Sequence, residues 1–468
     1  MQTKKVSPWI ALIPVIFLLV TLSYTILILE GSPHIPLMTS AIFASLVAMF
    51  MLGAEWSEIE EGIVETIKMS MGAILILMII GMVIGTWILS GVVPTMIYYG
   101  LKILSPKIFL LATLLMCSIV SLSTGSSWTT AGTVGVALMG VGMGLGIPSP
   151  MIGGAIISGA YFGDKMSPLS DTTNLAPAMA GAKLFDHIKH MLFTTGPSYI
   201  IAGIVFLVLG FQFGNNAMDL TIIDEMNQGL SQGFNLNPLL LLIPLIVIGI
   251  VVMKVPAIPG LFGGAIIGGF AAMIFQGSTI GDVVNALHSG YVSTTGVASV
   301  DELLTRGGLN SMMGTVALIL CAMAFGGVME KTGMLEALAN VVLHFARSTG
   351  QLVVAVIGSA VFMNLVAGDQ YLAIVIPGRM YKEAFERKGL APKNLSRALE
   401  DSGTLTSSLI PWNTCGAFMI ATLGLAPWTY IPFCILNLVN PLVSIFYGFT
   451  GITMEKLDEN AEVQTEIA

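Results

Sequence analysis

Long apolar runs separated by short polar stretches make up most of this 468-residue chain. Several runs approach the ~20 consecutive apolar residues that an α-helix needs to cross a lipid bilayer. This pattern predicts an all-α polytopic membrane protein. Its uninterrupted spans are expected over residues 8–29, 33–53, 70–91 and 191–213 in the first half, and over 237–253, 255–276, 310–330 and 427–449 in the second.

Two other apolar regions contain a polar stretch at their middle. In the region 107–147 this stretch is 121–130, and in the region 350–389 it is 364–371. We interpret each region as a re-entrant hairpin, which enters the membrane and leaves it on the same side. The polar stretches would then be the tips of the two hairpins.

Two further spans, 150–188 and 394–424, are interrupted by the polar segments 164–173 and 404–414. We interpret these segments as breaks in membrane helices. Non-helical backbone at membrane depth is tolerated only where it is buried in protein or lines a cavity. We therefore expect the two breaks and the two hairpin tips to meet at one polar site near the bilayer midplane.

The two halves of the chain match at one constant offset. A shift of 243 residues aligns LSTGSSW (122–128) with LVAGDQY (365–371), and the same shift aligns YFGDKMSPLSDTT (161–173) with TLTSSLIPWNTCG (404–416). Both matches fall on the polar interruptions. We therefore predict two structural repeats, each with five spans and one re-entrant hairpin. An odd number of crossings makes the two repeats inverted relative to each other.

This organisation divides the chain into four parts. They are the first inverted repeat (1–213), an extracellular linker (214–236), the second inverted repeat (237–452) and an acidic cytoplasmic tail (453–468). The orientation follows from the basic residues, which concentrate in cytoplasmic loops. With the N-terminus inside, 15 of the 19 lysines and arginines fall on or near the cytoplasmic side, and the linker has none. We therefore expect a bacterial-type cell membrane protein with both termini in the cytoplasm.

The composition argues against several other classes of protein. Hydrophobic residues make up 55% of the chain and charged residues only 10%, whereas soluble domains carry about 25% charged residues. The four cysteines are far apart and form no CxxC pair, so neither a disulfide framework nor a zinc site is indicated. No HExxH or GxSxG motif lies in a span. We therefore expect no enzyme, no bound cofactor and no nucleic-acid partner.

The four polar loops offer mostly oxygen atoms, which are the ligands that small hard cations such as Na+ prefer. Half-helix C-termini in the breaks favour a cation, and half-helix N-termini could hold a carboxylate. Substrate or Na+ binding is therefore expected from Ser123, Thr124, Ser126, Lys165, Ser170, Thr172, Thr173, Asn174, Thr404, Thr406, Ser407, Asn413 and Thr414.

Four aspartates in or beside these loops are the candidates for ion and proton coupling: Asp164, Asp171, Asp369 and Asp401. A charge at the bilayer centre costs at least ~2.5–3.5 kcal/mol, so such residues are functional candidates. A buried aspartate can exchange a proton for Na+, which is the minimal chemistry of an antiporter.

Three of these aspartates have a structural alternative. Asp171 could cap the second half-helix of the first break. Asp164 could form a structural ion pair with its neighbour Lys165. Asp401 and the adjacent Glu400 could be solvated charges in a cytoplasmic vestibule.

Two histidines, His187 and His190, lie one helical turn apart near the predicted cytoplasmic end of the first broken helix. We interpret them as surface residues. Sensing of pH is the alternative, because an unperturbed histidine changes its charge near neutral pH.

The motifs GDKMSPLSDTTN (163–174), AGDQY (367–371) and EDSGTLTSSLIPWNTCG (400–416) resemble those of the NhaC-type Na+/H+ antiporter family. The resemblance covers nearly the whole chain. It implies two inverted, hairpin-bearing repeats that are divided into a scaffold and a mobile transport part. The residues that it assigns to ion coupling are Asp164 and, as Na+ ligands, Asp171, Thr172, Asp369 and Asn413.

Some members of this family are similar to malate/lactate antiporters, which take up malate with protons and export lactate with Na+. We favour this exchange, by alternating access, from the overall appearance of the chain and because Lys165 places a positive charge where a carboxylate would bind. A plain Na+/H+ antiporter without an organic substrate is the alternative, and an ion channel is a more remote one. The expected partners are Na+, malate, lactate and the lipid bilayer. We leave open whether the chain forms a homodimer.

Overall fold

The computed structural model describes residues 6–29, 31–214, 220–253, 255–344 and 346–457. Within these ranges the chain is helical and has no strand longer than an isolated β-bridge. Eight helices in the same ranges are long and apolar enough to cross a membrane. The structure thus confirms the prediction of an all-α polytopic membrane protein.

The first half follows the predicted order of elements. Its elements are α1 (Pro8–Leu27), α2 (His34–Val47), the π-helical turn η1 (Ala48–Leu52), α3 (Trp56–Leu89), α4 (Val92–Ile103), α5 (Pro106–Thr124), α6 (Ser127–Thr130), the π-helical turn η2 (Ala131–Gly135), α7 (Val136–Gly144), α8 (Ser149–Met166), α9 (Asp171–Ala180) and α10 (Leu184–Gly214).

Two boundaries in this half differ from the prediction. Helix α3 begins at Trp56 rather than at residue 70, because Glu55 and Glu58 form a capping box at its N-terminus. Hydropathy detects only the apolar part of a helix and misses a polar first turn of this kind. Helix α9 ends at Ala180, where Gly181 adopts a left-handed conformation with φ of 81°. The predicted broken helix therefore ends before residue 188, and α10 starts earlier than expected.

The second half contains more elements than the prediction. They are α11 (Leu220–Gly233), the 3₁₀ turn η3 (Pro238–Leu241), α12 (Leu242–Val252), α13 (Ala257–Gln276), α14 (Ile280–Ser289), α15 (Ala298–Leu304), α16 (Leu309–Lys331), α17 (Met334–His344), α18 (Thr349–Val366), α19 (Gln370–Arg387), α20 (Pro392–Leu399), the π-helical turn η4 (Glu400–Thr404), α21 (Leu405–Ser407), α22 (Thr414–Leu423), the 3₁₀ turn η5 (Ile431–Phe433) and α23 (Ile435–Thr450). The predicted linker thus contains a helix, α11, and the last span begins at Ile435 rather than at residue 427.

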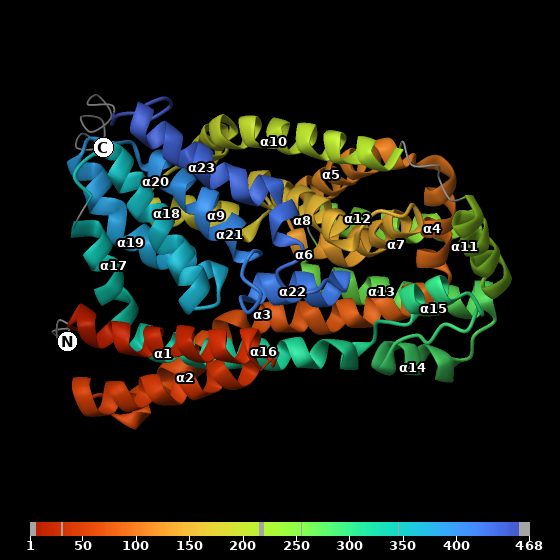
Figure 1. Ribbon diagram of the computed structural model, residues 1–468, viewed down its shortest axis with the longest axis horizontal. Coiled ribbons are helices and arrows are strands. Elements are labelled where there is room, and N and C mark those ends of the chain that lie inside the picture. The colour runs from red at the N-terminus through yellow and green to blue at the C-terminus, as the bar shows by residue number, and fades with distance from the viewer. Residues whose placement is uncertain (1–5, 30, 215–219, 254, 345, 458–468) are drawn as a thin grey trace.

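The helices form two bodies that lie side by side (Figure 1). The long-helix body consists of α1–α3, α12–α14 and α16. The broken-helix body consists of α5–α10 and α18–α23. Each body is held together mainly by packing between its own helices.

Glycines allow the closest packing in the long-helix body, between α3 and α16. A Cβ added at Gly62 would lie 2.9 Å from the carbonyl oxygen of Gly327, and one added at Gly81 would lie 2.4 Å from that of Gly308. Small residues let helix backbones approach closely in a membrane. Because the early part of α3 meets the late part of α16 and the reverse, the two helices run antiparallel.

The two predicted hairpins enter the broken-helix body from opposite ends (Figure 1). Helices α18 and α19 lie toward the end where α1 begins and α23 finishes, whereas α5 and α7 lie toward the end that holds α4 and α11. The tips of both hairpins lie in the interior. The assignment of 1–213 and 237–452 as inverted repeats stays a prediction.

Candidate ion-binding site

The tip of the first hairpin contacts the break between α8 and α9. Gly125 at the tip has a φ of 69°, and a Cβ added there would lie 2.7 Å from the carbonyl carbon of Leu169. The hydroxyl group of Ser127 donates a hydrogen bond of 2.6 Å to Oδ2 of Asp164. Glycine is thus required where the tip meets the break.

The tip of the second hairpin contacts the break between α21 and α22 in the same way. The side-chain amide of Asn413 donates hydrogen bonds of 3.1 Å to the backbone oxygen and to the side-chain oxygen of Asn364. The backbone amide of Thr414 donates to the carbonyl oxygen of Gly368 at 2.8 Å. These bonds satisfy backbone and amide groups that would otherwise be buried without partners.

Contacts between the two halves complete the site. The hydroxyl group of Tyr371 donates to Oδ2 of Asp171 at 3.4 Å. Trp128 of the first hairpin stacks on Phe418 of α22 with ring centroids 4.0 Å apart. The structure therefore brings all four polar loops together.

Asp164 ends the first half-helix in an oxygen-rich surrounding. It is 6% exposed, and its Oδ1 accepts a hydrogen bond of 2.7 Å from Ser170. The Ser170 hydroxyl in turn lies 3.2 Å from that of Thr172. Thr173 donates to the carbonyl oxygens of residues 164 and 165, both at 2.8 Å. One hydroxyl group of the first hairpin and one of the break thus donate to the Asp164 carboxylate.

The sequence also explains why helix α8 stops here. Proline disfavours the helical conformation in the residue before it, and Ser167, which precedes Pro168, is extended with ψ of 130°. Asn174 then closes the loop, because its side-chain amide donates to the carbonyl oxygens of Pro168 at 2.9 Å and Ser170 at 2.7 Å. Asn174 is itself exposed, and these two bonds hold the break; its predicted part in substrate or Na+ binding stays a prediction.

Lys165 forms an ion pair with Asp401 of the other half, and both side chains are fully buried. The alternative of a pair between Asp164 and Lys165 is therefore wrong. Thr194 donates to Oδ1 of Asp401 at 2.9 Å, and Nε of Arg397 lies 4.0 Å from its Oδ2. Asp401 thus lies between two cations.

Glu400 and Asp401 are both 0% exposed. The alternative that they are solvated charges in a vestibule is therefore wrong. They lie in the π-helical turn η4, which joins α20 to α21. A π-helical turn inside a helix is frequently found at a functional site.

Asp369 caps helix α19 and also contacts the long-helix body. Its Oδ1 accepts hydrogen bonds from the backbone amides of Tyr371 at 2.8 Å and Leu372 at 3.2 Å. Its Oδ2 accepts one of 3.3 Å from Ser70 on α3. Nothing in the sequence singles out Ser70, because a single serine in an apolar span is usually a packing residue.

Asp171 is the first residue of α9 and is exposed. The residue in the N-cap position of this helix is Ser170, so the alternative that Asp171 is the cap is wrong. Its contact with Tyr371 places it at the edge of the site.

The hydroxyl groups of the first hairpin mainly serve its own backbone. Ser123 donates to the carbonyl oxygen of Ile119 at 2.8 Å, and Thr124 donates to that of Ser121 at 3.5 Å. Ser126 caps α6 by accepting from the backbone amide of residue 129 at 3.1 Å. None of these bonds leads to the aspartates.

The second break has a mixed set of hydroxyl groups. Ser407 donates to the side-chain oxygen of Gln370 at 3.2 Å, which links the break to the second tip. Thr406 donates to the backbone oxygen of residue 402 at 2.7 Å, and Thr414 donates to Oδ1 of Asn413 at 3.4 Å. Thr404 is buried, and its hydroxyl group has no partner among the described residues.

The prediction that the two histidines are surface residues is wrong. His187 and His190 are 0% and 1% exposed rather than surface residues. His187 forms a hydrogen bond of 2.8 Å with Ser396, and His190 forms one of 3.1 Å with Asn394. Helix α20 covers this face of α10, and nothing in the local sequence shows that contact.

The four residues expected to coordinate Na+ do not form one cluster. In the described part of the chain, no hydrogen bond joins any two of Asp171, Thr172, Asp369 and Asn413. The described residues also contain no group of three or more His, Cys, Asp or Glu side chains with the geometry of a metal site. The assignment of these four residues as Na+ ligands stays a prediction.

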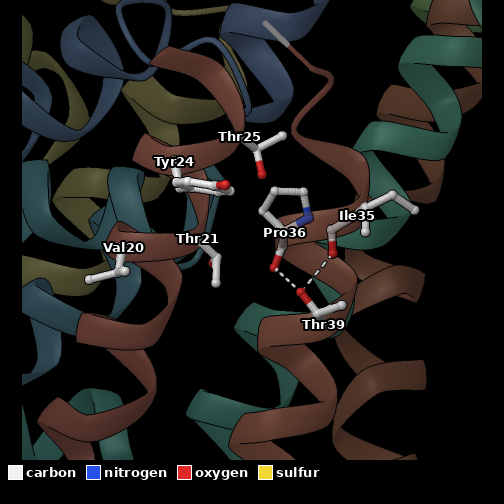
Figure 2. A pocket seen from close by; sticks show the side chains of 7 residues that line it. All are labelled: Val20, Thr21, Tyr24, Thr25, Ile35, Pro36 and Thr39. Atoms are coloured by element: carbon white, nitrogen blue, oxygen red, sulfur yellow. Dashed lines mark hydrogen bonds between the residues drawn. The ribbon is translucent and has the colours of Figure 1, made fainter. Parts of the chain in front are cut away.

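A hollow of about 250 Å³ lies on the surface of the long-helix body, between α1 and α2. Figure 2 shows that Thr39, one of its polar residues, already donates to the carbonyl oxygens of Ile35 and Pro36, at 2.9 and 3.1 Å. The hollow shares no residue with the four polar loops. It is a groove between two apolar helices and not part of the candidate site.

Comparison with known proteins identifies the family to which this chain belongs. Residues 159–452 match the model of the Na+/H+ antiporter family. The chain is 41% identical over 431 residues to the Na+/H+ antiporter NhaC of Alkalihalophilus pseudofirmus, covering 92% of each chain. It is 40% identical to the Na+/H+ antiporter NhaC of Bacillus subtilis, covering 95% of this chain and 98% of that protein. It is 36% identical to the malate-2H+/Na+-lactate antiporter of Bacillus subtilis, covering 93% of each. The chain therefore belongs to the Na+/H+ antiporter family.

Proposed function

We propose that this protein is a secondary active antiporter that exchanges Na+ for H+ across a bacterial cell membrane. The observation that carries the proposal is an imbalance of buried charge. Among the described residues, the buried carboxylic acids are Asp164, Asp369, Glu400 and Asp401, whereas the buried lysine and arginine are Lys165 and Arg397, with the two histidines His187 and His190 beside them. Unbalanced charge in a low-dielectric interior is costly. The excess of acid favours the binding of monovalent cations.

The Asp164 carboxylate is the best candidate for the Na+ site. Its neighbours are the hydroxyl groups of Ser127, Ser170 and Thr172, which are hard ligands of the kind that Na+ prefers. The break also exposes carbonyl groups at the C-terminal end of α8, where the helix dipole favours a cation.

Organic-acid exchange is the second candidate. A relative that is 36% identical carries out malate and lactate exchange by its name. However, Lys165, whose charge suggested a carboxylate substrate, is already paired with Asp401. We therefore give plain Na+/H+ exchange precedence.

The division into two bodies suggests how the ion site would open first to one side of the membrane and then to the other. All four polar loops belong to the broken-helix body, whereas the long-helix body contributes Ser70 at its boundary. We propose that the broken-helix body moves as a unit against the long-helix body, with both chain ends on the cytoplasmic side. The antiparallel packing of α3 and α16, which the offset places in equivalent positions of the two halves, supports an inverted repeat.

Transport by the reconstituted protein tests the proposal. The full chain in liposomes, loaded with a pH-sensitive dye, should move protons when a Na+ gradient is imposed. Asp164→Asn should abolish this movement, and Glu383→Gln, which removes an exposed charge, should leave it intact. Proton movement that needs malate and lactate on opposite sides would favour the second candidate. Absence of both activities would contradict the proposal.

A further inference from the structure

Among the described residues, Glu400 is a fully buried carboxyl group that accepts no hydrogen bond of normal geometry, although the hydroxyl groups of Thr172 and Thr404 lie near it. Its side chain is 0% exposed, and neither of its carboxyl oxygens has a partner in the described part of the chain. The hydroxyl group of Thr404, one helical turn later, has no partner there either. A buried ionised carboxylate without donors is very costly. This residue therefore differs from Asp164, Asp369 and Asp401, each of which accepts at least one hydrogen bond.

The charged and polar neighbours of Glu400 come from α8, α9, α20 and the turn η4 itself. Helix α8 contributes Lys165 and Asp164, and α9 contributes the hydroxyl group of Thr172. Helix α20 and the turn η4 themselves contribute Arg397 and Asp401.

Helix α10 contacts η4 through the hydrogen bond of Thr194 to Asp401 and brings the titratable side chains of His187 and His190 near the cluster. The remaining elements add no carboxylate, lysine or arginine at their contacts with η4. Helices α18, α21 and α23 contain no Asp, Glu, Lys, Arg or His, and the one tyrosine among them is Tyr447 of α23. Helix α19 meets η4 through Ala373 and Ile374. On α9 the acidic residue Asp171 is exposed and bonded to Tyr371.

These five charged residues have one acid in excess. Lys165 and Arg397 balance Asp401 and one further carboxylate, which leaves either Asp164 or Glu400 unbalanced. A proton on Glu400 makes the cluster neutral while Asp164 stays ionised. A Na+ ion at Asp164 makes it neutral while Glu400 is ionised. The cluster is thus neutral with one H+ or with one Na+, but not with both or with neither.

Hydrogen bonding decides which acid holds the proton. Asp164 accepts from Ser127 at 2.6 Å and from Ser170 at 2.7 Å, and such donors stabilise the ionised form. Glu400 accepts no such bond in the described part of the chain, and an ionised carboxylate that is buried without hydrogen bonds is costly. We infer that Glu400 is the group that holds the exchanged proton and releases it when Na+ binds at Asp164. In this step the O–H bond of the Glu400 carboxyl group breaks, its electron pair stays on the oxygen, and the proton leaves to water.

The inference rests on the proposed Na+/H+ exchange, and a binding experiment separates the two. Na+ binding to the purified full chain is measured by calorimetry in two buffers with different heats of ionisation, which counts the protons released. The wild type should release about one proton per Na+ bound. Glu400→Gln mimics the neutral carboxyl group, so it should bind Na+ more weakly than the wild type, release close to no proton on binding, and show an affinity that no longer depends on pH. Asp164→Asn should lose Na+ binding.

Two controls keep the result interpretable. Glu383→Gln should behave as the wild type, because Glu383 is exposed and pairs with Arg387 rather than with a member of the cluster. Glu400→Asp keeps the carboxyl group and should restore proton release. If Glu400→Gln does not fold, the infrared band of a protonated carboxyl group in the wild type should disappear on Na+ addition and shift in Glu400→Asp.

Two results are decisive against different claims. Undiminished proton release from Glu400→Gln, or an infrared band that is unchanged by Na+ or by Glu400→Asp, would overturn the role of Glu400 alone. No Na+ binding by the wild type would overturn the proposed function together with it.

Discussion

Asp369 has two separate roles, one for each of its carboxyl oxygens. Oδ1 caps helix α19 through two backbone amides, and Oδ2 faces Ser70 of the other body. Asparagine is as good an N-cap as aspartate, so Asp369→Asn keeps the first role and removes the charge. We expect this variant to melt near the wild-type temperature but to lose Na+-driven proton movement in liposomes.

A comparison with alanine separates the fold from the function. Asp369→Ala removes the cap and should also lower the free energy of unfolding by about 1 kcal/mol. Asp282→Asn removes an exposed aspartate in the first turn of α14, which bonds to Thr279 and to no residue of the polar loops, and serves as the control. Normal transport by Asp369→Asn would show that this carboxylate only stabilises the helix.

Asp301 organises the loop between α14 and α16, outside the membrane-spanning segments. It accepts hydrogen bonds from the side chain and backbone of Thr295, from Ser293 and from the backbone of Gly296. Chiefly the hydrogen bonds from Thr295 and Ser293 lower its pKa to about 2. A carboxyl group with a lowered folded-state pKa stabilises the fold above its unfolded pKa of about 3.9, and this contribution is lost as the pH falls through the folded value.

Asp301→Asn should therefore melt at a lower temperature than the wild type at neutral pH. The difference should stay constant down to about pH 4 and shrink below it. Thermal melting of both proteins across this range is the measurement. A difference that grows as the pH falls would contradict the assigned sign.

Individual site residues could be found from the sequence, but their partners could not. Asp164, Lys165, Asp369 and Asp401 stand out because charge is rare in apolar spans. The pairing of Lys165 with Asp401 joins residues 236 positions apart, and only the packing of the two halves creates it. Likewise, the burial of His187 depends on α20, which a local pattern cannot show.

At the scale of elements, the last described residues form a strap across the N-terminal end of α20. We define the strap as residues 451–457. The backbone of Glu455 forms hydrogen bonds with Ala391 and with both side-chain atoms of Asn394, at 2.7–3.1 Å. Its carboxylate pairs with Lys393 and lies 3.5 Å from Nδ1 of His190. The strap thus holds in place helix α20, which positions Arg397 beside Asp401.

Asn394→Ala should release the strap, because Asn394 is 1% exposed and supplies its buried hydrogen bonds. Loss of a buried partner costs about 1–3 kcal/mol, so we expect a lower melting temperature and faster proteolysis within 451–457. Asn310→Ala, at an exposed hydrogen bond to His288, is the matched control. Equal proteolysis in both variants would show that the strap is held by other contacts.

The order of the elements was more predictable than their ends. Apolar runs identify the membrane-spanning helices because the bilayer requires them, and polar stretches that each contain one glycine or one proline identify the tips and breaks. Helix ends depend on local capping, as at Glu55 for α3 and Gly181 for α9. A short amphipathic helix such as α11 lacks the long apolar run of a membrane span. Hydropathy therefore predicts only a linker at this position.

For the whole molecule, the contact between the two bodies is where the proposed movement must occur. Gly132 in η2 faces Ile80 in α3, and a Cβ added at Gly132 would lie 2.9 and 3.1 Å from the two Cγ atoms of Ile80. Cysteines in both positions would remove these Cγ atoms and place their Cβ atoms within reach of a disulfide, which needs about 3.8 Å. Oxidation of this double variant should therefore tie the two bodies together.

We expect the oxidised Gly132→Cys/Ile80→Cys protein to show no more Na+-driven proton movement than protein-free liposomes, and reduction to restore it. The control is Val247→Cys/Gly264→Cys, whose two sites lie within the long-helix body with Cβ atoms 3.8 Å apart. Its disulfide should form without changing transport, because it ties together helices that move as one. If both disulfides form and the first leaves exchange unchanged, movement between these bodies is not what carries Na+ across, and access must alternate within the broken-helix body instead.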